Sequence, residues 1–233
     1  MEKIPELSVF FPAYNEQENI SNTVGKAIEV LKEVAQKYEV IIVDDGSKDK
    51  TGEIADRLAK ENQFIRVVHH HPNRGYGEAL KSGFYNARYS WIAFTDADGQ
   101  FNFSEIKNLL EKTQEAAVIV GYRINRQDTA LRKINGWAWT LLNNLLLGIN
   151  VRDVDCAFKL IKKEVIDTIP RLESTRGGMI SPELLAKAKK SGFKIVEVGV
   201  HHYPRKAGKQ TGASFKVVLK SFIDLIKLWN KLK

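Results

Sequence analysis

The chain alternates short apolar runs with longer segments in which apolar residues recur at every third or fourth position. One such stripe lies within residues 18–38 and contains Ile20, Val24, Ala27, Ile28, Leu31, Val34 and Ala35. This spacing is typical of a helix that covers a core with one side. The pattern predicts helices over 18–38, 50–62, 77–87 and 104–116, and strands over 7–15, 39–45, 64–70, 91–98 and 117–123.

Single helices separate the five predicted strands. Strands joined in this way pair in parallel, and strands that are apolar throughout are buried on both faces. Residues 1–123 therefore predict a doubly wound, mostly parallel, Rossmann-like α/β sheet. Ligands of such sheets bind beyond the carboxyl ends of the strands. We expect residues 1–214 to form one domain and residues 215–233 to form an amphipathic C-terminal helix.

The charge of the chain narrows the choice of partner. Its 233 residues include 36 Lys and Arg against 28 Asp and Glu, a formal net charge of +8. This excess favours an anionic partner, such as a phosphorylated small molecule or an acidic lipid. No nucleic-acid partner is expected, because the sequence lacks a surface motif of interleaved aromatic and basic residues.

The compartment is predicted from what the sequence lacks. Cys156 is the only cysteine, which excludes an internal disulfide and fits a reducing environment. The first residues do not have the charge and apolar pattern of a signal peptide. No stretch reaches the roughly 18–20 apolar residues of a spanning helix. We expect a cytoplasmic protein, either soluble or peripheral at the membrane.

Two carboxylates lie at the end of the fourth predicted strand, in the segment FTDADGQF, residues 94–101. In an extended segment Asp96, Asp98 and Gln100 point to the same side. Two or three hard oxygens suit Mg²⁺ or Mn²⁺ and leave coordination positions for water and phosphate. The alternative interpretation is a turn in which the aspartates act as caps.

Other ligand motifs have little support. The sequence contains no Walker A pattern and no G-x-G-x-x-G. Three consecutive histidines occupy residues 69–71, but neighbouring side chains on a strand point to opposite faces, so a zinc site is not expected. Gly75 and Gly77 precede a predicted helix and fit either a phosphate-binding loop or a simple turn.

Five ordered motifs together resemble the family 2 glycosyltransferases of the GT-A fold, in the branch around dolichyl-phosphate mannosyltransferase and other polyprenyl-phosphate glycosyltransferases. The motifs are FFPAYNEQENI, EVIIVDDGSKDKT, NRGYGEALKSG, FTDADGQF and VGYR. The resemblance covers residues 7–123 strongly and continues more loosely through 151–165 and 198–214. It implies a nucleotide-binding half, 1–123, and an acceptor half, 124–214.

The resemblance implies roles for residues after the first two strands. Pro12, Tyr14 and Glu16 would line the pocket for the nucleobase and ribose. Val43 and Asp45 would meet the edge of the base. The donor would be a UDP- or GDP-sugar.

It also implies roles after the fourth and fifth strands. Asp96 and Ala97 would approach the ribose and diphosphate. Asp98 and Gln100 would complete the metal site with Asp96. Arg123 would reach the sugar or the diphosphate, and the reaction would be a single displacement with inversion.

The downstream part of the chain departs from the family pattern. Arg205 matches a basic loop that closes over the diphosphate, but the loop is longer here. Lys206, Lys209 or Gln210 would then share its role.

The acceptor stays open between two kinds. A hydroxyl acceptor needs a general base, for which Asp155 and Glu183 are candidates. A lipid phosphate needs only positive groups, and four basic residues suit it: Arg126, Arg132, Lys133 and Arg152. These four could equally be a solvated basic face, and Asp155 an internal partner of Arg152 or Lys159. A third reading is a non-catalytic protein that binds a nucleotide or a lipid surface.

Two apolar segments predict contact with a membrane. On a helical wheel of residues 214–233 one arc is basic, and the wider arc contains Phe215, Val218, Phe222, Leu225, Ile226 and Trp229. Residues 134–149 have a similar character and include two Trp, which suit a headgroup boundary. The alternatives are a core helix for 134–149 and a homodimer contact for the C-terminal helix.

Overall fold

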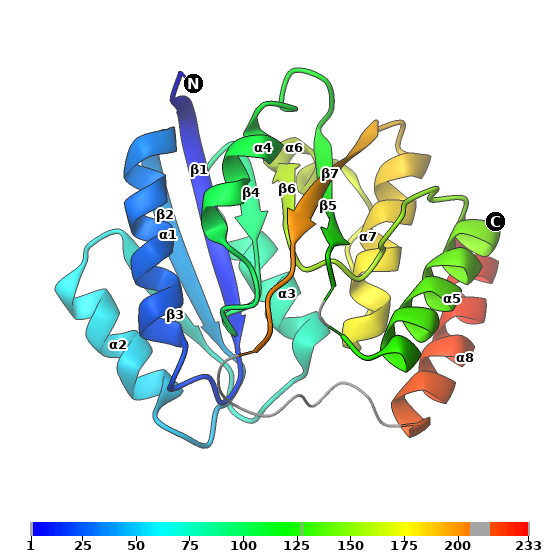
Figure 1. The fold of residues 1–233 in the computed structure, drawn as a ribbon, viewed down its shortest axis with the longest axis horizontal. Coiled ribbons are helices and arrows are strands. Elements are labelled where there is room, and N and C mark those ends of the chain that lie inside the picture. Colours follow the sequence, from blue (N-terminus) through cyan, green and yellow to red (C-terminus); the bar gives the residue numbers. More distant parts are fainter. Residues whose placement is uncertain (1, 127, 206–214, 233) are drawn as a thin grey trace.

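The structure is a computed structural model that describes residues 2–126, 128–205 and 215–232, without the side chains of residues 215–219. Seven strands form one sheet in the order β3-β2-β1-β4-β6-β5-β7 (Figure 1). The strands are β1 Ile4–Ala13, β2 Ala35–Asp44, β3 Ile65–His69, β4 Trp91–Phe94, β5 Val118–Ile124, β6 Lys159–Lys162 and β7 Ile195–His201. The helices are α1 Ile20–Val34, α2 Thr51–Glu61, α3 Tyr76–Asn86, α4 Ile106–Leu110, α5 Ala130–Leu147, α6 Lys163–Thr168, α7 Gly177–Lys190 and α8 Phe215–Leu232, with a 3₁₀ turn, η1, over Phe103–Glu105.

The prediction of a mostly parallel α/β sheet is confirmed. β1, β2, β3 and β4 pair in parallel, and so do β5 and β7. β6 is antiparallel to both β4 and β5. The carboxyl ends of the other six strands therefore meet at one edge of the sheet. β6 comes from the second half of the chain and lies between β4 and β5. The two halves of the chain, 1–123 and 124–214, therefore contribute strands to one sheet.

Side chains of the central strand β1 alternate between two cores. Val9 and Phe11 face the apolar stripe of α1. Phe10 faces the other side, where its ring lies 4.9 Å from Phe84 of α3 and 5.2 Å from Phe94 of β4. Helices therefore cover both faces of the sheet, as a doubly wound fold requires.

A pair of helices lies at the end of the molecule beyond α7. α5 and α8 run side by side in Figure 1, and the ring of Trp139 contacts that of Phe222 at 5.5 Å. Met179 of α7 forms a small core with Leu225 and Leu228 of α8. In the part of the chain that the structure describes, no helix has the length and apolar character to cross a bilayer.

Several predicted boundaries differ from the structure. The helix predicted over 18–38 ends at Val34, and β2 begins at Ala35, because residues 35–38 pair with the start of β1. The strand predicted over 91–98 ends at Phe94, and the helix predicted over 104–116 ends at Leu110. The short strand β6 was not predicted.

Gly83 marks a close approach between α3 and β1. A Cβ atom at this position would lie 2.2 Å from the Phe10 ring. Alanine is favoured over glycine inside a helix by about 1 kcal/mol, but overpacking a core costs about 1–3 kcal/mol. The difference between these two effects is about 0–2 kcal/mol, so we expect Gly83→Ala to lower the free energy of unfolding by up to about 2 kcal/mol in urea denaturation.

Gly25 in α1 is the matched control, because a Cβ atom there would have nothing within 4 Å. Gly25→Ala should raise the free energy of unfolding by about 0.5–1 kcal/mol. Equal stability changes in the two variants would contradict the packing described for α3.

Candidate active site

Hydrogen bonds join the loop after β1 to the segment that follows β2. The Asn15 N–H donates to Ser47 Oγ at 3.0 Å, and the Glu16 N–H donates to Thr51 Oγ1 at 2.8 Å. Asn15 has a positive φ of 57°, a conformation that Asn tolerates better than most residues. These bonds place the buried carboxylate of Glu16 at the carboxyl edge of the sheet.

The predicted base-pocket residues lie along these two strands. Pro12 of β1 is the register partner of Val43 of β2, and both are buried. Tyr14 is half-buried in the loop that follows β1. The structure therefore brings Pro12, Tyr14 and Val43 to the same edge.

Asp45 organises the turn before α3. Its carboxylate accepts hydrogen bonds from the Arg74 N–H at 2.9 Å and the Gly75 N–H at 2.8 Å. The ring Nδ1 of His70 lies 2.7 Å from the same carboxylate. The described contacts of Asp45 are thus with its own chain, and its predicted contact with a base stays a prediction.

Three acidic side chains meet beyond β4. Burial and the charge of Asp98 raise the pKa of Asp96 to about 7, although a hydrogen bond from the Tyr76 hydroxyl, at 2.6 Å, opposes the rise. Burial also raises the pKa of Asp98, against a hydrogen bond from the Gln100 N–H at 3.0 Å. The pKa of Glu16 is raised as well, mainly by burial. A cation at this corner would relieve the repulsion.

Arg205 places one positive charge at this corner. Its guanidinium pairs with Glu16 and lies 3.4 Å from Asp98. The backbone of Tyr203 exchanges two hydrogen bonds with Gln100: the Tyr203 N–H donates to the Gln100 carbonyl at 2.9 Å, and the Gln100 side-chain amide donates to the Tyr203 carbonyl at 3.0 Å. A segment more than 100 residues away in sequence is thereby fixed beside Asp98. Lys206, Lys209 and Gln210 lie outside the described residues.

The donor set fits a divalent cation. Asp96, Asp98 and the Oε1 atom of Gln100 are hard oxygens, which Mg²⁺ and Mn²⁺ prefer. Across residues 2–126, 128–205 and 215–232 no group of three or more His, Cys, Asp or Glu side chains forms a metal cage. Two carboxylates and one amide oxygen would leave coordination positions of such an ion open for water and phosphate, as Mg²⁺ has with phosphate esters.

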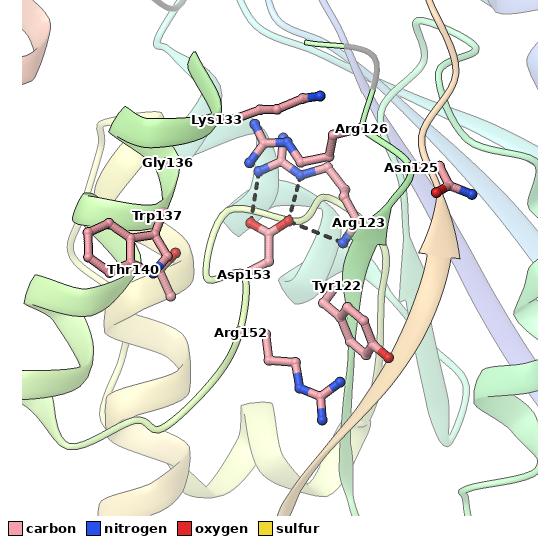
Figure 2. A pocket seen from close by; sticks show the side chains of 10 residues that line it. All are labelled: Tyr122, Arg123, Asn125, Arg126, Lys133, Gly136, Trp137, Thr140, Arg152 and Asp153. Carbon is pink, nitrogen blue, oxygen red and sulfur yellow. Dashed lines mark hydrogen bonds and ion pairs between the residues drawn. The ribbon is translucent and has the colours of Figure 1, made fainter. Parts of the chain in front are cut away.

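A cationic cavity lies beyond the end of β5. Its volume is about 450 Å³, and its lining includes four basic side chains but one carboxylate. Arg123 binds that carboxylate, Asp153, in a bidentate pair at 2.6 and 2.8 Å. Figure 2 shows Lys133 and Arg126 on one side of Asp153, with Arg152 on the other side near Tyr122. The basic side chains are Arg123, Arg126, Lys133 and Arg152.

The walls of the cavity come from β5 and the residues after it, from α5, and from the segment that contains Arg152 and Asp153. Burial alone would raise the pKa of Asp153, but its bonds with Arg123 lower it below the usual value. The carboxylate therefore stays charged and holds the Arg123 side chain at the cavity wall. Gly136 of α5 leaves room for Arg126, since a Cβ atom there would lie 3.0 Å from the guanidinium. The predicted residue Arg132 is not on the wall and pairs with Asp128 at 3.4 Å.

The two predicted bases occupy different settings, and neither lines the cavity. Burial and the charge of Asp153 raise the pKa of Asp155 to about 6. Glu183 is buried in an ion pair with Lys187 at 2.5 Å and accepts hydrogen bonds from the backbone of residues 173–174. Burial alone would raise the pKa of Glu183, but these partners lower it. Glu183 therefore stabilises a loop in the described structure.

Arg152 does not pair with Asp155, whereas the charge of Lys159 opposes the rise in the pKa of Asp155, so the interpretation of Asp155 as an internal partner of Lys159 keeps support. Arg152 lies 3.9 Å from Glu197 and stacks over the Tyr122 ring. Lys159 is fully buried and donates to the Val154 and Cys156 carbonyls and to the Ser181 hydroxyl.

The sequence interpretation missed two residues of the site. Tyr76 stands in the motif NRGYG, in which the two glycines indicate a turn but nothing indicates a role for the aromatic residue. Asp153 stands two residues before Asp155, and the repeated Asp in VRDVD was the available signal. Whether Arg123 pairs with Asp153 or with Asp155 depends on the register of β5, which a short motif does not specify.

Known proteins share this architecture. The crystal structure of glucosyl-3-phosphoglycerate synthase from Mycobacterium tuberculosis in complex with Mn²⁺, UDP and phosphoglyceric acid matches with a TM-score of 0.73 and 17% identity, covering 98% of this chain and 78% of that one. The described fold is the GT-A fold of glycosyltransferases.

Sequence comparison defines the family. Residues 8–169 match glycosyl transferase family 2. A dolichyl-phosphate beta-glucosyltransferase of Trichomonas vaginalis is 32% identical, over 95% of this chain and 72% of the relative. Undecaprenyl-phosphate 4-deoxy-4-formamido-L-arabinose transferase of Photorhabdus laumondii is 30% identical, over 97% of this chain and 68% of the relative. The chain belongs to glycosyl transferase family 2 and is a glycosyltransferase.

Another relative is much longer than the matched region. Glycosyltransferase AglD of Haloferax volcanii is 32% identical over 86% of this chain, but the match spans 33% of that protein.

His69 links β3 to the end of β2 and to α2, and it should make stability depend on pH. Its ring lies 3.0 Å from both Asp44 and Asp56. Partial burial lowers the pKa of His69, but the bonds and charges of these carboxylates outweigh it and raise the pKa above 6.5. The stabilisation is therefore complete below about pH 6.5 and is lost as pH rises through the raised pKa.

We expect His69→Gln to cost about 0.5–1 kcal/mol more at pH 5.5 than at pH 8.5, since the side chain is partly exposed. Urea denaturation of both proteins at the two pH values measures the difference. A cost that is constant, or larger at pH 8.5, would exclude a charged His69.

Proposed function

We propose that this chain transfers a sugar from a UDP- or GDP-sugar to a polyprenyl phosphate, with inversion and with the help of Mg²⁺ or Mn²⁺. The observation that supports this most directly is the pairing of two sites at one sheet edge: the acidic corner of Asp96 and Asp98, and the cationic cavity. The names of the relatives, which include dolichyl-phosphate and undecaprenyl-phosphate transferases, agree with such an acceptor.

The acidic corner would bind the donor. Asp96 and Asp98, with Gln100, would hold the ion, which when bound neutralises the diphosphate as a Lewis acid. Pro12, Tyr14, Val43 and the nearby Asp45 and Ala97 would surround the nucleoside. Arg205 would exchange its carboxylate partners for the diphosphate and add charge-assisted hydrogen bonds as the leaving oxygen gains charge.

The cationic cavity would bind the acceptor phosphate. An oxygen of that phosphate would attack the anomeric carbon, while the bond from this carbon to the diphosphate breaks. A phosphate oxygen is already anionic, so no proton has to be removed. Among the described residues that line the cavity, the one carboxylate, Asp153, is paired with Arg123, which favours this acceptor over a hydroxyl that needs a base.

The exposed faces of α5 and α8 would place the enzyme at a membrane. Eight of the eleven exposed large apolar side chains among the described residues lie on these two helices. We call them the α5–α8 apolar face: Leu131, Ile134, Trp137, Leu141, Leu145, Phe222, Ile223 and Ile226. Exposed lysines on the same helices, such as Lys133, Lys220 and Lys227, suit anionic headgroups.

The domain assignment and the compartment stay proposals too. We propose that residues 1–214 act as the catalytic domain and that the helix in 215–233 contributes to membrane attachment, at the cytoplasmic face. Trp137 both lines the cationic cavity and belongs to the apolar face, so a lipid acceptor could reach the cavity from the bilayer surface.

Asp98→Asn tests the donor site. Transfer of radiolabelled sugar from UDP- or GDP-sugar into an organic-phase polyprenyl phosphate should depend on Mn²⁺ and fall about a hundredfold or more in the variant, because several kcal/mol of charge stabilisation are lost. Asp167→Asn removes an exposed carboxylate of α6 and should keep full activity. Undiminished transfer by Asp98→Asn would remove the metal assignment, and label that stays in the aqueous phase would indicate a soluble acceptor.

Leu145→Glu tests the apolar face, because Leu145 is 73% exposed and its loss should not affect folding. The wild-type protein should float with liposomes that contain anionic lipid, and the variant should stay at the bottom of the gradient. Gln114→Glu adds the same charge at an exposed position elsewhere and should float. Equal flotation of all three proteins, or a dimer in sedimentation equilibrium that only Leu145→Glu dissociates, would contradict membrane docking.

A further inference from the structure

The hydroxyl of Tyr76 reaches one of the two paired aspartates from a different part of the chain. Tyr76 is the first residue of α3, whereas Asp96 follows β4. The hydroxyl donates to Asp96 Oδ1 at 2.6 Å, a short bond to a charged acceptor. At the acidic corner this side chain joins the start of α3 to the segment that follows β4.

The backbone around Tyr76 is fixed on its amino-terminal side. The turn before α3 ends at Gly75, whose N–H donates to Asp45 and whose φ is +94°, in the region that favours glycine. The Asp45 carboxylate also accepts a hydrogen bond from the Arg74 N–H. Two hydrogen bonds to one carboxylate therefore hold the backbone of the turn that precedes Tyr76.

The loop before α7 and the first residue of α7 pack against the start of α3, next to Tyr76. The Gly77 N–H donates to the Thr175 carbonyl at 3.1 Å, and a Cβ atom at position 77 would lie 2.5 Å from the Thr175 carbonyl carbon. A Cβ atom at Gly177 would lie 3.3 Å from the Tyr76 ring. Two glycines thus allow close backbone contact, which restricts the ring to one orientation.

We propose that Tyr76 is a positioning residue for the divalent cation of the donor site. By occupying Asp96 Oδ1, its hydroxyl leaves Oδ2 of the same carboxylate to face the ion and fixes the plane of the carboxylate. Partners of this kind keep a metal ligand in its binding orientation, and their loss typically weakens metal affinity about 10–100-fold. The inference rests on the proposed function, since it presupposes that Asp96 is a metal ligand.

Tyr76→Phe removes the hydroxyl and keeps the ring. The experiment titrates Mn²⁺ into the whole 233-residue chain with saturating UDP or GDP, and follows free Mn²⁺ by electron paramagnetic resonance. We expect the Kd for Mn²⁺ to rise about tenfold or more, while the affinity for the nucleotide without metal and the midpoint of thermal unfolding change little.

Tyr85→Phe is the matched control, because Tyr85 lies at the other end of α3 and its hydroxyl accepts a hydrogen bond from the Leu172 N–H. This variant should bind Mn²⁺ as the wild type does. Wild-type affinity in Tyr76→Phe would overturn the positioning role alone. Equal losses in both variants would also overturn it, since they would indicate a general effect on α3. If the wild-type protein itself binds no Mn²⁺ with either nucleotide, the proposed metal site is wrong and this inference falls with it.

Discussion

Negative charge held beyond the end of β4 is the constraint on which the rest of the site depends. Asp96, Asp98 and Glu16 are brought together by the sheet and partly removed from water, so each has a raised pKa. Such a cluster is stable only where cations offset the repulsion and the loss of hydration. The described structure supplies Arg205, and the proposed reaction would add a metal ion and exchange Arg205 onto the diphosphate.

The sheet edge separates charge into two zones with different tasks. The acidic zone follows β4, whereas the basic zone follows β5 and is completed by α5. In the basic zone Asp153 orients Arg123 and Asp128 pairs with Arg126, while four basic side chains still line the cavity. In the proposed reaction the acidic zone would bind the nucleotide-sugar donor together with a cation. The basic zone would bind the phosphate of the acceptor. The antiparallel strand β6 sets the spacing, because it lies between β4 and β5.

Local patterns were sufficient for the order of strands and helices in residues 1–123 and for the place of Asp96 and Asp98 next to the fourth strand, because buried parallel strands are continuously apolar and their loops are polar. They failed where distant pairing decided the outcome. Residues 35–38 continue the helical pattern of α1, yet hydrogen bonds to β1 make them a strand. Strand β6 has four residues, and it is a strand because it pairs with β4 on one side and β5 on the other. The contacts of Tyr76 and Arg205 with the acidic corner also join segments far apart in sequence, so no short motif contains them.

The most direct test of this account is a crystal grown with Mn²⁺ and UDP or GDP, with diffraction data that record the anomalous signal of manganese. The account predicts an anomalous peak about 2.0–2.2 Å from oxygens of Asp96 and Asp98 and of the diphosphate, typical of a small octahedral ion, with Arg205 turned from Glu16 to the diphosphate. Nucleotide bound without such a peak, and with Arg205 still paired to Glu16, would contradict it.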